Sequence, residues 1–199
     1  QARKGKVTIM TAPEGRVRMD VLSFTDDLIS VLAVKDGLFI YFERGQKGCL
    51  AGPFCAAPMV SSFPSLADPE KLAGVMQGIL PLLPDPESQT LVFSRKEGVY
   101  ILTLAAGDLV QEVRISPTGK WATQGLLKRG GKVILKVDFK GRLKVGQRTV
   151  PQMVRLRAPA EDIDLLVDFR EAEYGYEFKG DPFSFKCPGG VDVQFLNCM

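Results

Sequence analysis

The chain has 199 residues, of which 45% are hydrophobic and 25% charged, values typical of a folded globular protein. Its 26 basic and 23 acidic residues give a net charge of +3, without the clustered Lys and Arg that a nucleic-acid partner requires. The absence of histidine excludes Ser-His-Asp triads, Cys-His dyads and His-containing zinc sites. We therefore expect a single domain over residues 1–199 that is not an enzyme, uses no metal or cofactor and binds no nucleic acid.

Short apolar runs separated by turns predict a mainly β fold with few helices. Runs at 7–10, 17–22, 28–34 and 38–42 are joined by tight turns, and Asp36-Gly37 is a strong hairpin signal. This pattern is typical of an antiparallel meander. Further strands are expected at residues 90–94, 98–104, 109–116, 120–127, 133–139, 151–157 and 163–169. So many strands favour a curved sheet or barrel over a flat sheet, which leaves long exposed edges.

One helix is expected after residue 68. Asp68 is a good N-cap, Pro69 suits the first helical position, and Pro81 ends the segment. Apolar residues recur between them at helical spacing, namely Leu72, Val75, Met76, Ile79 and Leu80. This apolar helix either packs on a sheet face as part of the core or forms a movable lid over a cavity.

Four cysteines occur as two close pairs, Cys49 with Cys55 and Cys187 with Cys198. The first pair lies where the meander is expected to break, at residues 45–58. Four cysteines allow three connectivities, and proximity favours Cys49–Cys55 and Cys187–Cys198. Two disulfides in an oxidising compartment fit better than an all-cysteine zinc site. Such a compartment implies that a signal segment, since removed, preceded Gln1.

The end of the chain resembles the F-x-F-x-x-P-x-G-V-x-V closing segment of LolA-type periplasmic lipoprotein carriers. The segments 150–156 and 163–167 resemble a passage of LolB-like lipoproteins, and the order of elements agrees across most of the chain. The residues that match the closing motif are Phe183, Phe185, Pro188, Gly190, Val191 and Val193.

The resemblance implies a curved antiparallel half-barrel around an apolar cavity that holds acyl chains beneath a helical lid. The lid candidates are the apolar helix residues. The strand residues that we expect to line the cavity, with Trp121 at its mouth, are Val21, Leu32, Phe39, Tyr41, Phe93, Ile101, Val113, Trp121 and Phe139. Ordinary core packing is the competing interpretation of each. Leu50 and Phe54, between two cysteines, are candidates for a loop that touches a membrane or a partner, unless the loop folds back onto the core.

These observations predict a non-enzymatic cell-envelope protein, a monomer that binds the acyl chains of lipids or lipoproteins as a carrier, acceptor or chaperone. It would lie in the periplasm, either free or tethered to the outer membrane as a lipoprotein. An outer-membrane surface and an envelope protein are the further partners expected. The alternative is a structural or assembly lipoprotein that uses the same fold as a protein-interaction module. Because acidic residues such as Glu161 and Asp162 cluster around turns, they fit a solvated face better than a catalytic pair.

Overall fold

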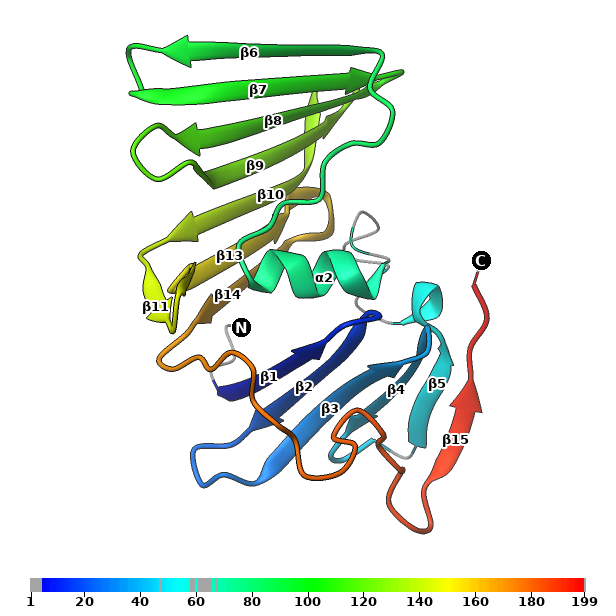
Figure 1. Ribbon diagram of the computed structural model, residues 1–199. Coiled ribbons are helices and arrows are strands. Elements are labelled where there is room, and N and C mark those ends of the chain that lie inside the picture. Colours follow the sequence, from blue (N-terminus) through cyan, green and yellow to red (C-terminus); the bar gives the residue numbers. More distant parts are fainter. Residues whose placement is uncertain (1–4, 47, 58–59, 61–65, 67, 199) are drawn as a thin grey trace. The chain divides into compact units, whose positions relative to one another are not determined.

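The computed structural model describes residues 5–46, 48–57, 60, 66 and 68–198. These residues form two compact units (Figure 1). The first unit is made of Gln1–Ala73 with Glu177–Met199, and the second of Gly74–Tyr176. The second unit is therefore one continuous stretch of chain between two parts of the first. Within the described ranges, no helix is long and apolar enough to cross a membrane.

The first unit contains a six-stranded sheet, and its strands β1 to β4 form the antiparallel meander that the sequence predicts. Asp36 and Gly37 have φ of +52° and +74° in the turn after β3, as a type I′ hairpin turn requires. In sheet order, the strands are β1 (Lys6–Ala12), β2 (Arg16–Leu22), β3 (Leu28–Lys35), β4 (Leu38–Glu43), β5 (Gly48–Pro53) and β15 (Asp192–Phe195).

Strand β5 corrects the expectation that the meander breaks over residues 45–58. Gly48, Gly52 and Pro53 are typical of a turn, yet β5 pairs antiparallel with β4. A Cβ at Gly52 would lie 2.3 Å from the Leu196 carbonyl oxygen, so glycine is needed there to let the end of the chain approach. That end forms β15, which pairs parallel to β5.

The closing segment that resembles the LolA motif covers one face of this sheet. The Phe185 ring lies 6.2 Å from that of Phe42 in β4 and 5.8 Å from the Arg18 guanidinium, measured to ring centroids. Arg18 also donates a 2.8 Å hydrogen bond to the Pro182 carbonyl oxygen. The buried Phe183 ring lies under the Arg16 guanidinium. The two phenylalanines therefore anchor the segment through aromatic and cation–π contacts.

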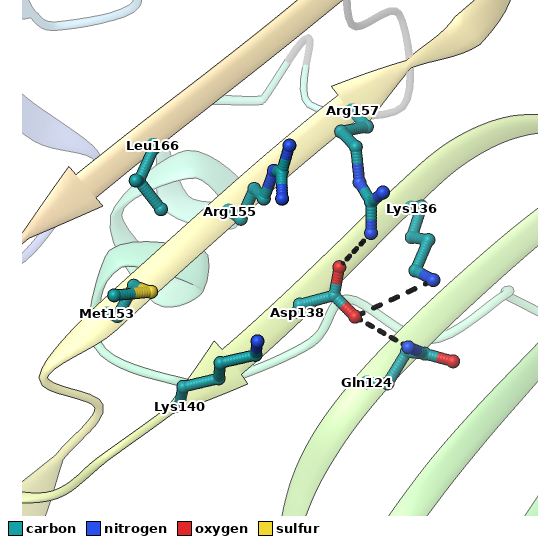
Figure 2. Close-up of a pocket in the computed structure, with 8 residues that line it drawn as sticks. All are labelled: Gln124, Lys136, Asp138, Lys140, Met153, Arg155, Arg157 and Leu166. Carbon is teal, nitrogen blue, oxygen red and sulfur yellow. Dashed lines mark hydrogen bonds and ion pairs between the residues drawn. The ribbon is translucent and has the colours of Figure 1, made fainter.

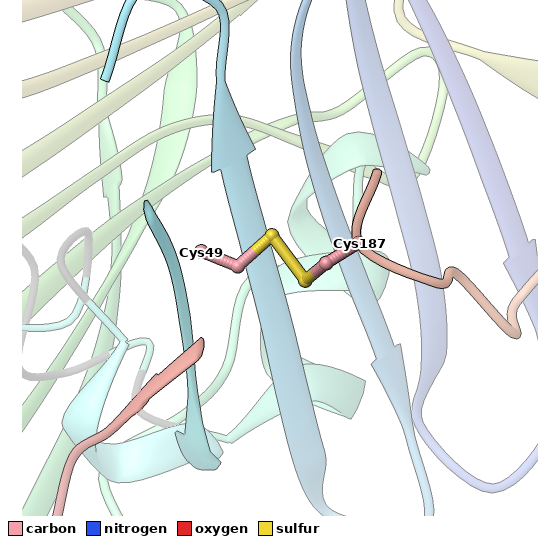
Figure 3. The surroundings of a disulfide bond; sticks show 2 residues. All are labelled: Cys49 and Cys187. Carbon is pink, nitrogen blue, oxygen red and sulfur yellow. A yellow bond between two sulfur atoms is a disulfide. The ribbon is translucent and has the colours of Figure 1, made fainter. Parts of the chain in front are cut away.

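Two disulfides fasten the same segment, and their pairing differs from the one that proximity favours. Cys49 is bonded to Cys187, as Figure 3 shows, and Cys55 is bonded to Cys198. The Cα atoms of the two pairs lie 6.3 and 5.6 Å apart. Proximity failed because pairing β15 beside β5 brings together cysteines separated by 138 and 143 residues. A loop of this length corresponds to about 5 kcal/mol in the chain-entropy model, more than the short loops would give.

The second unit is built on a curved seven-stranded antiparallel sheet that is not closed into a barrel (Figure 1). In sheet order, its strands are β6 (Ser88–Ser94), β7 (Val99–Ala106), β8 (Leu109–Ser116), β9 (Trp121–Arg129), β10 (Lys132–Lys140), β13 (Met153–Ala158) and β14 (Ile163–Asp168). Two short strands, β11 (Leu143–Val145) and β12 (Arg148–Val150), form a separate hairpin that the sequence pattern did not predict.

The helix begins as predicted and ends earlier. It is α2 (Pro69–Met76), and Asp68 accepts a 2.8 Å hydrogen bond from the backbone N–H of Glu70 as its N-cap. Gly78, with φ of +87°, donates to the Val75 carbonyl, and the Ile79 N–H donates to the Gly74 carbonyl. These bonds form a Schellman C-cap, so the helix stops before Ile79 although the apolar periodicity continues.

The disulfide pairing predicts the outcome of a single cut in the second unit. A protease site placed in the exposed turn at Gly130 and Gly131 should yield two fragments that remain one covalent species until reductant is added, because both bonds span the cut. Reducing and non-reducing gels after digestion measure this. Separation of the fragments without reductant would instead support the pairing of neighbouring cysteines.

An ion pair on the first unit makes its stability pH-dependent. Hydrogen bonds from Lys35, Ser184 and the Phe183 N–H hold the pKa of Asp181 well below its usual value of 3.8. The ionised carboxylate therefore stabilises the fold above pH 3.8, and this contribution is lost as the pH falls further.

We expect Asp181→Asn to lower the stability at neutral pH and to flatten its decline between about pH 4 and 2. Urea unfolding at a series of pH values measures this. Lys35→Gln should reduce the same dependence, since it removes the main hydrogen-bond donor to Asp181. A variant curve parallel to that of the unmodified chain would contradict the assignment.

Candidate functional site

The seven-stranded sheet has one apolar face and one charged face. One row of register partners crosses all seven strands on the apolar face: Leu91, Leu102, Val113, Gly125, Val137, Leu156 and Leu165. The adjacent row, on the other face, is Val92, Ile101, Arg114, Gln124, Asp138, Arg155 and Leu166. Successive side chains along a strand point to opposite faces, so the sheet keeps two chemically different surfaces.

The apolar face is buried in the middle of the sheet and open at its β6 end. Val113, Val137 and Leu156 are at most 3% exposed. In contrast, Leu91 is 61% exposed and Phe93 is 45% exposed, although both side chains of β6 lie on this same face. Tyr100, beside Phe93 in the register, is 41% exposed, and the two rings meet edge to face at 5.1 Å. These three residues are defined here as the open apolar end.

The segment that follows α2 covers the middle of the apolar face. A Cβ at Gly125 would lie 2.8 Å from Cδ1 of Leu80, so this glycine admits the leucine side chain. The buried Gln111 of β8 accepts a 2.7 Å hydrogen bond from the Leu83 N–H and donates a 2.8 Å bond to the Pro81 carbonyl. This amide satisfies backbone groups that would otherwise be unpaired, and it holds the covering segment on the sheet.

A pocket of about 360 Å³ lies on the charged face, over β9, β10, β13 and β14 (Figure 2). Its lining residues are Gln124, Lys136, Asp138, Lys140, Met153, Arg155, Arg157 and Leu166. Four of the eight are cations and one is an anion, so the pocket is electropositive. Across the described parts of the chain, no cluster of three or more His, Cys, Asp or Glu residues could hold a metal ion.

Asp138 is the central acceptor of this pocket. Its side chain is 13% exposed and accepts hydrogen bonds from Arg157 and Gln124, while the Lys136 ammonium lies 3.8 Å away (Figure 2). At the rim, Arg155 forms a two-bond ion pair with Asp164, which lowers the pKa of Asp164 and raises that of Arg155. The pocket is thus a hydrogen-bond network with an excess of cations, which suits an anionic group.

The residues expected to line one cavity are divided between the two units. In the first unit, Val21, Leu32, Phe39 and Tyr41 do share one face of the six-stranded sheet. Leu32 and Phe39 are buried, and the other two are half-buried.

The lid candidates do not all belong to the helix. Leu72, Val75 and Met76 are buried in α2. Ile79 is 62% exposed and Leu80 half-buried, both beyond the end of the helix.

In the second unit, Val113 and Phe139 are buried on the apolar face, where Phe93 also lies. Ile101 lies on the opposite face, in register with Arg114, so it cannot line the same surface as Phe93. Trp121 is half-buried, with the Arg142 guanidinium 3.7 Å from its ring centroid.

The expected contact loop is not a protruding tip. Leu50 is a half-buried residue of strand β5. Phe54 is 3% exposed in the 3₁₀ turn η1 (Phe54–Ala56), so its ring folds back into the core of the first unit. Phe54 therefore packs on the core, as the alternative interpretation of this loop predicts.

Sequence reasoning missed the pocket, although a signal was present. Charged residues occupy every second position of 136–140 and 155–157, a pattern typical of a solvated strand face. The two-residue spacing shows that the charged side chains within each strand share a face. It does not show that Asp138 would lie opposite Gln124 and Arg155, because that depends on the register of three strands.

Comparison with known proteins bears on the fold. No protein-family model and no curated protein sequence matches the chain. The structure is similar to that of a DUF1329 family protein from Desulfovibrio piger, with a TM-score of 0.53 and 11% sequence identity over 85% of this chain and 75% of that chain. That family has a LolA/LolB-like fold, so the likeness supports this fold class and, at such low identity, no more.

Removing the central carboxylate of the pocket should destabilise the second unit. Asp138→Ala would leave Lys136 and Arg157 without their shared acceptor, and we expect a loss of about 1–3 kcal/mol in the free energy of unfolding. Urea denaturation measures this loss. Asp164→Asn, which breaks the more exposed ion pair at the rim, is the matched control and should cost much less. Equal losses in the two variants would contradict the central role of Asp138.

Proposed function

We propose that this chain is a non-enzymatic protein of the cell envelope that binds acyl chains of lipids or lipoproteins at the open apolar end. The observation that carries the proposal is the exposure of Leu91, Phe93 and Tyr100 on a face whose middle is buried. An exposed apolar surface next to a folded core is the kind of surface on which hydrocarbon binds. The LolA/LolB-like fold raises the expectation through analogy alone.

The energetics suit reversible binding. Each buried methylene contributes roughly 0.8 kcal/mol, so a chain segment of about eight methylenes gains about 6 kcal/mol from burial. The aromatic rings of Phe93 and Tyr100 add flat apolar surface next to the aliphatic Leu91. Transfer of such a ligand requires no covalent step, in keeping with a carrier, acceptor or chaperone.

The two disulfides support a location in an oxidising compartment. We propose the periplasm, with the chain either free or tethered to the outer membrane, where lipids and lipoproteins are available. A structural or assembly role, with a protein partner on the same apolar surface, is the alternative that an exposed patch of this kind also supports.

Native mass spectrometry of the purified chain, followed by lipid analysis of its organic extract, tests the proposal. A stoichiometric acyl-bearing species, or a mass shift after incubation with phospholipid or an acylated peptide, is the expected result. A ligand-free mass that such incubation leaves unchanged would reject acyl binding and favour the structural role.

Two variants test whether the acyl ligand binds to the apolar face of the sheet. The double substitution Phe93→Ser with Tyr100→Ser should weaken binding of a fluorescent fatty acid at least tenfold, because it removes both rings of the open apolar end. Val92→Ser is the matched control, since Val92 is 61% exposed on the opposite face of the same strand. Similar losses in the control and the double variant would show that binding does not depend on the apolar face.

A further inference from the structure

Strand β6 differs from the other edge strands of the two large sheets. A free edge presents unpaired backbone N–H and C=O groups, and proteins usually protect it with charged residues, proline or a bulge. The opposite edge, β14, carries Asp164 and Asp168; in the first unit, β1 carries Lys6 and β15 carries Asp192. Strand β6 has the sequence Ser-Gln-Thr-Leu-Val-Phe-Ser, without charge or proline, and pairs with β7 without a bulge.

This unprotected strand is also exposed on both faces. Leu91 and Val92 point to opposite faces and are each 61% exposed, and Phe93 is 45% exposed. All seven residues of β6 are paired only with β7 on one side, and β6 ends the sheet (Figure 1). Such an edge is suited to the addition of one further strand.

The residues that flank β6 identify the strand that fits. Glu87 and Arg95 lie immediately outside its two ends, both exposed, and Arg95 forms no ion pair with the described residues. In an antiparallel pair of two β6 strands centred on Leu91, residue numbers opposite each other add up to 182. Within the strands this register places Thr90 opposite Val92. Continued by one residue beyond each end of β6, it places Glu87 of each copy opposite Arg95 of the other.

From this complementarity we infer that β6 is the site at which a second copy of this chain pairs, edge to edge and antiparallel, with Leu91 on the two-fold axis. Two symmetric Glu87–Arg95 ion pairs close the ends of the added ladder. The pairing joins the apolar faces of two second units into one surface, because Leu91 then lies beside Leu91 of the other copy. The sequence analysis expects a monomer, whereas this pairing would give a dimer.

The register explains why a copy of the same chain is the favoured occupant. The backbone of a neutral edge strand can pair with any extended segment. A segment whose charges all have one sign, or have the reverse order, would place a like charge opposite Glu87 or Arg95 and be repelled. The strand itself supplies the opposite charges at the right spacing when it is turned antiparallel. The contact is one strand wide, so the association is weak and concentration-dependent.

Sedimentation equilibrium of the full chain over about 1–200 µM tests the inference. We expect a monomer–dimer equilibrium in which Arg95→Glu raises the dissociation constant about tenfold, since it opposes two pairs of like charges. The double variant Glu87→Arg with Arg95→Glu restores opposite charges with their order reversed, and should recover most of the affinity. A monomer at every concentration, or a dimer insensitive to Arg95→Glu, would overturn the inference.

Cysteine cross-linking tests the register independently of charge. Leu91→Cys places two thiols directly opposite each other, with Cβ atoms about 5 Å apart, so mild oxidation should give a reducible dimer on a gel. Gln89→Cys is the matched control on the same face, because its two copies lie four residues out of register, about 13 Å apart. Cross-linking of the control as efficient as that of Leu91→Cys would refute this register.

Discussion

The two-residue alternation of side chains along the strands is the constraint on which the second unit depends. In β10, the side chains of Leu135, Val137 and Phe139 point to the apolar face. Those of Lys136 and Asp138 point to the charged face. Each neighbouring strand must hold the register that keeps its own apolar residues on the same side, because a shift by one residue would expose them all. The apolar face and the charged pocket are both consequences of this one arrangement.

Local chemistry predicted the elements that depend only on neighbours in the sequence. The hairpin at Asp36-Gly37 and the helix start at Asp68 and Pro69 were confirmed, since a turn type and an N-cap are determined by adjacent residues. The end of α2 was misjudged because apolar spacing continued to Leu80, whereas the left-handed conformation of Gly78 decides where the helix stops. A glycine two residues after the last buried helical position was the available signal.

Features that depend on distant contacts could not be predicted from one sequence. Strand β5 resembles a turn in composition and is a strand because β4 and β15 pair with it on both sides. Asp138 has no distinguishing feature in the sequence, because only the registers of β10 with β9 and with β13 bring Gln124 and Arg157 to its carboxylate. Ile101 and Phe93 were both assigned to a cavity wall because their type fits one, yet their strands place them on opposite faces.

The pairing of the cysteines has a consequence for the order of events during synthesis. Cys49 and Cys55 leave the ribosome more than a hundred residues before Cys187 and Cys198, and only five residues lie between the first two. Until translation is nearly complete, each of them therefore has the other as its nearest available thiol. A bond formed between them would have to be reopened by thiol–disulfide exchange before β15 could be fastened beside β5. In an oxidising compartment, the yield of native protein would thus depend on disulfide isomerisation, a demand that pairing between neighbours would never create.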